Sequence, residues 1–450
     1  MPKRDEHAVW AAFIWPGGHH HGAWRLPGET GEDLLSFDNY KRMALEAERG
    51  KFDVVFLGDR LDSWPLPTEL LSRTARAARL ETLTLTGALA AVTDRIGIVA
   101  TASTTFSEPF NIARQIGGLD HISGGRIGWN VVTSYTDDQA RNYGLDKIPE
   151  RPERYARAQE FLDVVRGLWD TFDDDAVIRD KASGQFFHAD GFHKLDHVGR
   201  HFSVAGPLNM ERPPQGHPVI CQAGASKDGI AFAARNGELL FTIASSKVRA
   251  KEFYDTVKSG ASDAGRDPSD VKVLVSLNPV VGRTEREAQE KYEQMQELLD
   301  PDVSRTFAEN QFGIDLDAYP LDELVPDIDL PEVRNGMPRA HREFMLNKAR
   351  DEGLTMRQLI NGFNGTNIYP ASAEAVADQF EDWFQDGACD GFIMQVSHNT
   401  GGMTDFVDLV VPLLRDRGLI REEYTSSTLR GHLGLARPSS RYAPAVHGAG

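Results

Sequence analysis

Asn130, Thr133 and Ser134 form a polar cluster at the end of a short apolar stretch that begins at Ile127. The turn 123–125 comes before this stretch and ends the preceding helical pattern. An apolar stretch between a turn and polar residues has the composition of a buried β-strand. In a (β/α)8 barrel the loops after the C-terminal ends of the strands build the binding site. The sequence therefore predicts a site around these three residues.

Two more predicted strands end in polar residues. Asp59 follows the apolar run 52–57, and Thr101 begins the run of small residues 101–105, in which four carry hydroxyl groups. Small hydroxyl-bearing side chains can hydrogen-bond a planar ligand without filling the space that it needs. The position of Asp59 fits the rim of a barrel, and it fits equally well a helix N-cap or a salt bridge with Arg60.

Arg151 and Tyr155 are four residues apart in the predicted helix 151–169, so they share a face near its N-terminus. A guanidinium and a phenol beside free backbone N–H groups suit a phosphate. On the pattern alone, pairing of Arg151 with Glu150 or Glu153 is the stronger interpretation.

Ser226 ends a turn of small residues, 223–226, in front of the predicted helix 227–235. Serine is a preferred N-cap, and such a turn exposes backbone N–H groups to an anion. Capping and phosphate binding can coexist at this residue. The turn is therefore a second candidate for phosphate binding.

The composition narrows the class of protein. The chain has 450 residues, and its hydrophobic share of 40% indicates a sizeable core. Its net charge of -18 argues against nucleic-acid or anionic-membrane partners, which bind basic patches. Two cysteines exclude a disulfide framework, and no apolar run is long enough for a membrane span or a secretory signal. We therefore expect a cytoplasmic protein. The histidines 19–21 lack partners at ligand spacing, so no metal site is predicted.

Alternating strands and helices predict a parallel α/β architecture, a (β/α)8 barrel with insertions. The predicted helix 69–80 carries arginines at threefold spacing, which we interpret as a solvated face. The other predicted strands are 9–15, 96–100, 218–222, 239–243, 271–281 and 390–396, and the other predicted helices are 37–49, 109–122, 247–264, 285–299, 371–385 and 405–417.

One domain is predicted over 1–437, with excursions near 173–212 and 300–370 and a tail at 438–450. The second excursion is a candidate lid or oligomer contact. From residue 422 onward the chain is predicted to be loop-like, and its last dozen residues are predicted to be disordered.

Seven segments make the sequence recognisable: HGAWR (21–25), ERGKFDVVFLGD (48–59), LDHISGGRIGWNVVTS (119–134), ERYARAQEFLDVVRGLW (153–169), GPLNMERPPQGHPVICQAGAS (206–226), AYPLDE (318–323) and DGFIMQ (390–395). They resemble the bacterial luciferase-like flavin monooxygenases. The resemblance is to the subgroup with nitrilotriacetate monooxygenase component A, dibenzothiophene-sulfone monooxygenase and pristinamycin synthase. It runs in colinear order through nearly the whole chain.

This resemblance implies a luciferase-like TIM barrel that uses FMNH2 from a separate NAD(P)H-dependent flavin reductase, together with O2, to oxygenate a small organic substrate. It also implies a homodimer or homotetramer. Catalytic residues are not assigned. The resemblance places FMN contacts at Asp59, Thr101, Arg151, Tyr155, Ala225 and Ser226, with Asn130 as a further candidate. Arg151 stands where relatives often carry histidine.

The positions that line the site of the alkane-oxidising relative carry Trp15, Gly18, Trp64 and Tyr135 here, which do not match its residues. The resemblance therefore disfavours alkanes and favours a sulfur- or nitrogen-containing or aromatic compound. Two alternatives remain: an F420-dependent oxidoreductase on the same barrel, and a flavin-binding protein without turnover.

Overall fold

The computed structural model describes residues 4, 6–28, 34–224, 226–244, 246–331, 339–363, 368–399 and 401–443. Within these ranges, eight parallel strands close into a barrel in the order β1-β12-β9-β8-β7-β4-β3-β2. The predicted α/β barrel is confirmed. Its strands are β1 (Val9–Ile14), β2 (Val54–Leu57), β3 (Gly97–Ser103), β4 (Ile127–Val132), β7 (Val219–Gln222), β8 (Leu239–Thr242), β9 (Lys272–Ser276) and β12 (Gly391–Gln395).

Helices surround the barrel because the strands are apolar on both faces and need cover on the outside. The largest buried cluster lies between the strands and these helices, and a second cluster fills the barrel interior. None of the helices in the described ranges is long and apolar enough to span a bilayer. The covering helices are α1 (Phe37–Arg49), α3 (Thr82–Ala90), α4 (Pro109–Ser123), α6 (Arg151–Trp169), α7 (Lys227–Asn236), α8 (Lys247–Asp263), α13 (Ala373–Gln385) and the consecutive segments α14 (Gly402–Asp405), η5 (Phe406–Val410) and α15 (Val411–Asp416).

The predicted helix 69–80 is wrong. Only α2 (Thr68–Leu71) is helical there, and the chain then runs irregularly to α3. Arg73 is exposed, but Arg76 is only 6% exposed and donates to backbone carbonyl groups of the loop after β1. The threefold spacing predicted that Arg76 lies on a solvated helix face, but Arg76 is buried by contacts with a loop distant in sequence.

The predicted strand 271–281 is two strands. It bends at Leu277, and β10 (Asn278–Gly282) leaves the barrel to pair in parallel with β11 (Ile368–Ser372). Both halves are apolar and buried, so composition alone did not mark the bend. The helix α9 (Glu285–Glu297) follows β10, where the helix 285–299 was predicted.

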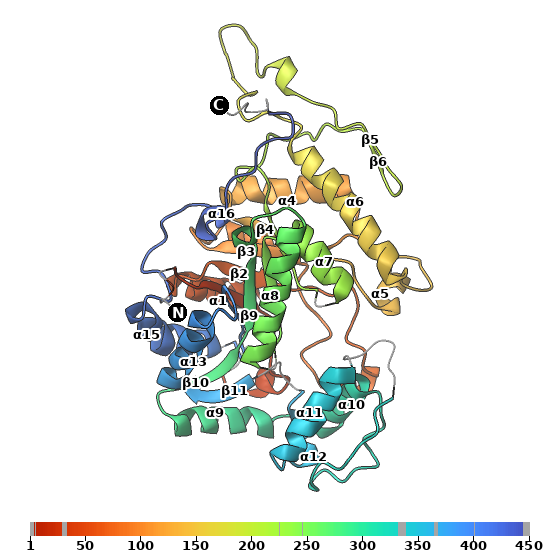
Figure 1. Ribbon diagram of the computed structural model, residues 1–450, viewed down its shortest axis with the longest axis vertical. Helices are drawn as coiled ribbons and strands as arrows, with labels where there is room; N and C mark the ends of the chain where they lie inside the picture. Colours follow the sequence, from red (N-terminus) through yellow and green to blue (C-terminus); the bar gives the residue numbers. More distant parts are fainter. Residues whose placement is uncertain are drawn as a thin grey trace.

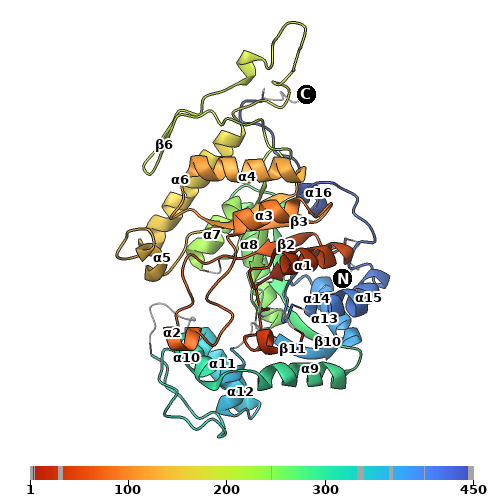
Figure 2. The same cartoon turned by 180° about the vertical axis from the view of Figure 1, so that it is seen from behind.

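The two excursions lie at opposite ends of the molecule (Figure 1). The segment 173–212 is mostly irregular, with the pair β5 (His197–Val198) and β6 (Ser203–Val204). The second excursion contains α10 (Pro301–Phe312), α11 (Arg339–Asp351) and α12 (Met356–Asn361), which enclose a core of their own. Helix α10 lies beside α2 (Figure 2). The ring of Phe307 packs at 5.2 Å from that of Trp64 and at 5.0 Å from that of His21, so this excursion touches the loops after β1 and β2. Its role as a lid stays a prediction.

The C-terminal segment, which was predicted to be loop-like, covers the N-terminal end of the barrel. It forms α16 (Leu429–His432), and Leu429, Leu433 and Leu435 join the cluster inside the barrel. Leu429 packs directly against the backbone of Gly97, because a Cβ at Gly97 would lie only 2.5 Å from Leu429 Cδ1. The predicted disordered tail lies mostly outside the described residues, which end at 443.

Leu429→Ala is expected to destabilise the protein by about 2–5 kcal/mol, because a fully buried leucine would leave a cavity that rigid strands cannot fill. Thermal or urea unfolding measures this. Leu324→Ala is the matched control, since Leu324 is 65% exposed and its truncation should change stability by less than about 0.5 kcal/mol. Equal effects of the two substitutions would contradict a sealing role for α16.

Candidate functional site

A chain of hydrogen bonds crosses three neighbouring strands at the C-terminal end of the barrel. Thr101 of β3 and Asn130 of β4 are register partners, and both are buried. The Asn130 amide Nδ2 donates to Thr101 Oγ1 at 2.9 Å, and Thr101 Oγ1 donates to the Leu57 carbonyl at the end of β2 at 2.8 Å. The structure thus brings together two of the residues that the sequence predicted for the site.

This chain of bonds fixes which way the Asn130 amide faces. The Thr101 hydroxyl commits its proton to Leu57, so it can only accept from Asn130, and Nδ2 must point toward it. The Asn130 Oδ1 atom then points away, and it has no donor among the residues that the structure describes. A buried acceptor without a partner costs about 1–3 kcal/mol, so its presence indicates a ligand that supplies an N–H or O–H donor. The predicted flavin has such groups on its ring, and this residue fits it.

Asp59 lies at the same rim, directly after β2. Its carboxylate accepts from the Arg60 backbone N–H at 2.8 Å, and burial raises its pKa to about 6. Neither structural alternative for Asp59 is observed, because Arg60 pairs with Asp62 at 3.0 Å and the N-caps of the next two helices, α2 and α3, are Pro67 and Glu81. A half-buried carboxyl group with a raised pKa beside a barrel mouth is a candidate for ligand contact.

Aromatic side chains line the barrel interior below this rim. The ring centroids of Phe13 and Phe56 are 4.9 Å apart, and those of Phe56 and Phe241 are 5.0 Å apart. Gly58 lets Phe13 come close, because a Cβ there would lie 2.6 Å from the ring. These rings give the site an apolar floor that excludes water.

The second group of predicted residues lies at the N-terminus of α7. Ser226 caps this ten-residue helix by accepting from the Gly229 N–H at 3.1 Å, as the sequence predicted. A Cβ at Gly229 would lie 2.9 Å from the Tyr155 hydroxyl oxygen, so the phenol of α6 stands at this helix end. Backbone N–H groups, a hydroxyl and a phenol together suit a phosphate.

Arg151 is the first residue of α6 and is exposed, one helical turn before Tyr155. Glu153, one of its two alternative partners, pairs instead with Arg200 at 2.8 Å. Ala225, the remaining predicted position, lies outside the described residues.

The sequence reasoning missed a cluster beside the rim. Arg76 stacks on the indoles of Trp15 and Trp64, with its guanidinium carbon 5.7 and 5.6 Å from the two ring centroids, and Arg79 lies 5.1 Å above Trp15. The four residues come from two loops far apart in sequence, so no local pattern links Trp15 to Trp64, Arg76 and Arg79. Only the expectation that Trp15 and Trp64 line the site pointed to this cluster.

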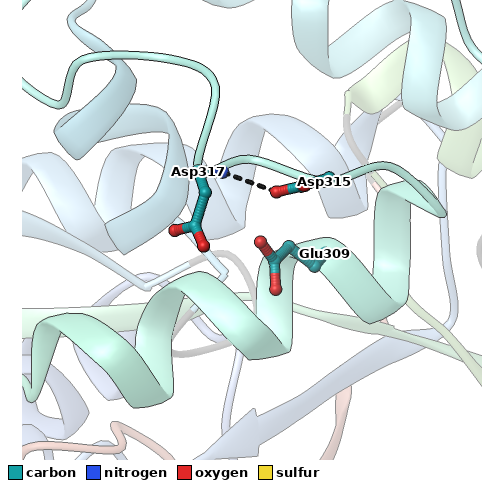
Figure 3. Close-up of side chains that lie close together, drawn as sticks. All are labelled: Glu309, Asp315 and Asp317. Atoms are coloured by element: carbon teal, nitrogen blue, oxygen red, sulfur yellow. Dashed lines mark hydrogen bonds between the residues drawn. The ribbon is translucent and has the colours of Figure 1, made fainter.

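One acidic cluster in the described part of the chain could hold a metal ion. Carboxylate oxygens of Glu309, Asp315 and Asp317 lie within 4.8 Å of one another beside α10 (Figure 3). Each already has a partner: Glu309 accepts from the Leu316 N–H at 3.0 Å, Asp315 from the Asp317 N–H at 2.9 Å, and Asp317 pairs with Arg305. These contacts shape the turn after α10 and do not by themselves specify a metal.

Comparison with known proteins places the chain in a family. A family model described as luciferase-like monooxygenase matches residues 14–389. The chain is 42% identical over 98% of its length to N-acetyl-S-(2-succino)cysteine monooxygenase of Bacillus subtilis (strain 168), of which it covers 100%. It is also 42% identical over 95% of its length to nitrilotriacetate monooxygenase component A of Aminobacter aminovorans, of which it covers 96%. The crystal structure of DmoA from Hyphomicrobium sulfonivorans superposes with a TM-score of 0.86 at 31% identity, covering 95% of this chain and 92% of that one. The chain therefore belongs to the luciferase-like family of flavin-dependent monooxygenases.

Proposed function

We propose that the chain is the oxygenase component of a two-component monooxygenase that takes FMNH2 from a separate NAD(P)H:flavin reductase. The observation that carries this proposal is the orphaned Oδ1 of Asn130 at the barrel mouth. The groups at the N-terminus of α7, with Ser226 and Tyr155, support the phosphate-bearing flavin FMN in particular. The name of the relative called component A supports a separate partner that supplies the reduced flavin.

Each group of residues has a distinct task in this proposal. Bound FMNH2 supplies the electrons that activate O2, so one oxygen atom enters the substrate and the other leaves as water. Asn130 and Asp59 orient the ring by accepting hydrogen bonds from its N–H groups. Ser226, Tyr155 and Arg151 hold the phosphate. The floor of phenylalanines keeps water away from the reacting face.

The proposed substrate is a small organic compound that contains sulfur or nitrogen or an aromatic ring. Related enzymes act on carboxylated compounds such as nitrilotriacetate, and also on uncharged ones such as dibenzothiophene sulfone. The relatives therefore leave the charge of the substrate open.

The proposed function is tested by combining the purified chain with an NADH:FMN reductase, 18O2 and a panel of such compounds. We expect labelled oxygen in a product only when chain, reductase and FMN are all present. Omitting the chain is the control for unproductive oxidation of free FMNH2. Failure of the apoprotein to bind FMN, or reduction of substrates by reduced F420 without O2, would contradict the proposal.

Flavin affinity is expected to fall as the pH drops through about 6, because Asp59 has a pKa of about 6 and accepts a hydrogen bond from a ring N–H more strongly when it is ionised. Riboflavin is the proper ligand for this titration, since the phosphate of FMN also titrates near pH 6. Quenching of riboflavin fluorescence between pH 5 and 8 measures the affinity. In Asp59→Asn this pH dependence should disappear. A variant that keeps the inflection would place the titrating group elsewhere.

A further inference from the structure

Arg76 is a buried cation in the loop before α3. Only 6% of the residue is exposed, and its Nη2 donates to the carbonyl oxygens of Gly18 and His19, each at 3.0 Å. The indoles of Trp15 and Trp64 cover it. Carbonyl oxygens and aromatic faces attract a cation but do not neutralise it.

No carboxylate in the described ranges forms an ion pair with Arg76. The neighbouring charge is the second guanidinium, Arg79, and repulsion between the two adds to burial in lowering the pKa of Arg76 to about 9. Burial, and after it the charge of Arg76, lowers the pKa of His19 and of His20 to about 3, so both imidazoles are neutral. Asp59 and Asp62 lie near Arg79, so the positive charge that lacks a counter-ion is that of Arg76, which is unfavourable in a buried place unless an anion joins it.

The hydrogen-bond donors around Arg76 also lack negatively polarised partners. Three atoms in this cluster are buried and have no partner in the part of the chain that the structure describes: Trp15 Nε1, Trp64 Nε1 and Arg79 Nη1. All three are donors. Buried donors are normally satisfied, so three of them around one cation indicate that acceptor atoms come from a ligand.

This cluster adjoins the proposed flavin site. The His19 ring packs at 4.6 Å from that of Phe13, inside the barrel, and at 6.1 Å from that of Trp15. A Cβ at Gly58 would lie 2.6 Å from Phe13 and 3.5 Å from Trp15, and Gly58 directly precedes Asp59. A molecule held by Arg76 would therefore lie next to the ring that Asp59 and Asn130 are proposed to orient.

We propose that the substrate is an anion and that Arg76, with Trp15, Trp64 and Arg79, binds a carboxylate group of it. This inference rests on the proposed function, because it names the substrate class of that same site. The charge of the substrate carboxylate supplies the missing counter-ion of Arg76, and the carboxylate oxygen atoms accept hydrogen bonds from the two indoles and from Arg79. Arg60 does not add to the uncompensated positive charge, because Asp62 already forms an ion pair with it.

The test is calorimetric titration of the full-length protein with tricarballylate, a compound with three carboxylates, and with its uncharged triamide. We expect saturable binding of the tricarboxylate only. Arg76→Gln should weaken this binding by at least about tenfold, which corresponds to the loss of a single charged hydrogen bond. Arg286→Gln is the matched control, because the Arg286 side chain is 87% exposed and should not affect binding.

Two further variants keep the test decisive if Arg76→Gln does not fold. Arg76→Lys keeps the charge and should retain binding better than Arg76→Gln. Trp15→Phe keeps the ring beside Arg76 but removes a donor that bonds nothing in the described residues, so it should fold normally and bind the tricarboxylate several times more weakly.

FMN binding by each protein separates this inference from the proposed function. If the chain binds FMN but not tricarballylate, or if Trp15→Phe and Arg76→Gln bind tricarballylate as tightly as the unaltered protein, the anion site is wrong and the flavin enzyme stands. If tricarballylate binding depends on Arg76 and Trp15 but FMN does not bind, the anion site stands and the proposed function is wrong.

Discussion

Asn130→Leu is expected to weaken flavin binding by about 10- to 100-fold while leaving the folded protein as stable as before, or more stable. Leucine has the same branching and the same number of side-chain heavy atoms as asparagine, and it removes the buried Oδ1 that has no partner in the described chain. The one bond that is lost, from Nδ2 to Thr101, leaves the Thr101 hydroxyl still donating to Leu57. Opposite signs for affinity and stability are the mark of a residue kept for its ligand. Fluorescence titration with FMN and urea unfolding of the apoprotein measure the two quantities.

Asn236→Leu is the matched control for this experiment. Asn236 is as buried as Asn130, at 3% exposed, but its amide bonds Gln159, Arg166 and the Phe232 carbonyl. Its replacement should destabilise the fold by about 2 kcal/mol or more and leave flavin affinity unchanged. If Asn130→Leu instead destabilises the fold like this control, Asn130 serves the barrel and not a ligand.

The sequence predicted most of the barrel because its elements carry local signals. Helix 151–169 begins and ends where its apolar stripe predicted, and 37–49 does so as well. The strand at 271–281 was wrong because a bend between two buried strands changes direction without changing composition. The extended barrel register, which brings Thr101 opposite Asn130, follows from strand order and not from spacing along the chain.

The site was predictable where a residue's role is local. Capping of α7 by Ser226 could be inferred from a serine in front of a helix. The role of Arg76 could not, because its partners are the carbonyl groups of a loop 57 and 58 positions earlier and two tryptophan rings. Threefold spacing of arginines predicts an exposed face when local pattern is all that is known, and only tertiary packing reverses it.

Ser226→Asp is expected to weaken FMN binding by at least about 100-fold and to leave riboflavin binding unchanged. Aspartate caps helices as well as serine does, so α7 and the fold should keep their stability. The new carboxylate would stand where we propose that Ser226 contacts the phosphate, and two like charges at contact distance in a partly buried site repel strongly. Parallel titrations with FMN and riboflavin isolate the phosphate, because the two ligands share the same ring.

The neighbouring βα unit supplies the control. Ser246 caps α8 in the same way, accepting from the Arg249 N–H at 3.3 Å, so Ser246→Asp introduces the same charge at an equivalent helix end. We expect little change in FMN affinity there. If both aspartates weaken FMN equally, the effect is a general one of charge at this face of the barrel. If neither does, the phosphate does not bind at α7, and the preference for FMN over unphosphorylated flavin must come from another part of the chain.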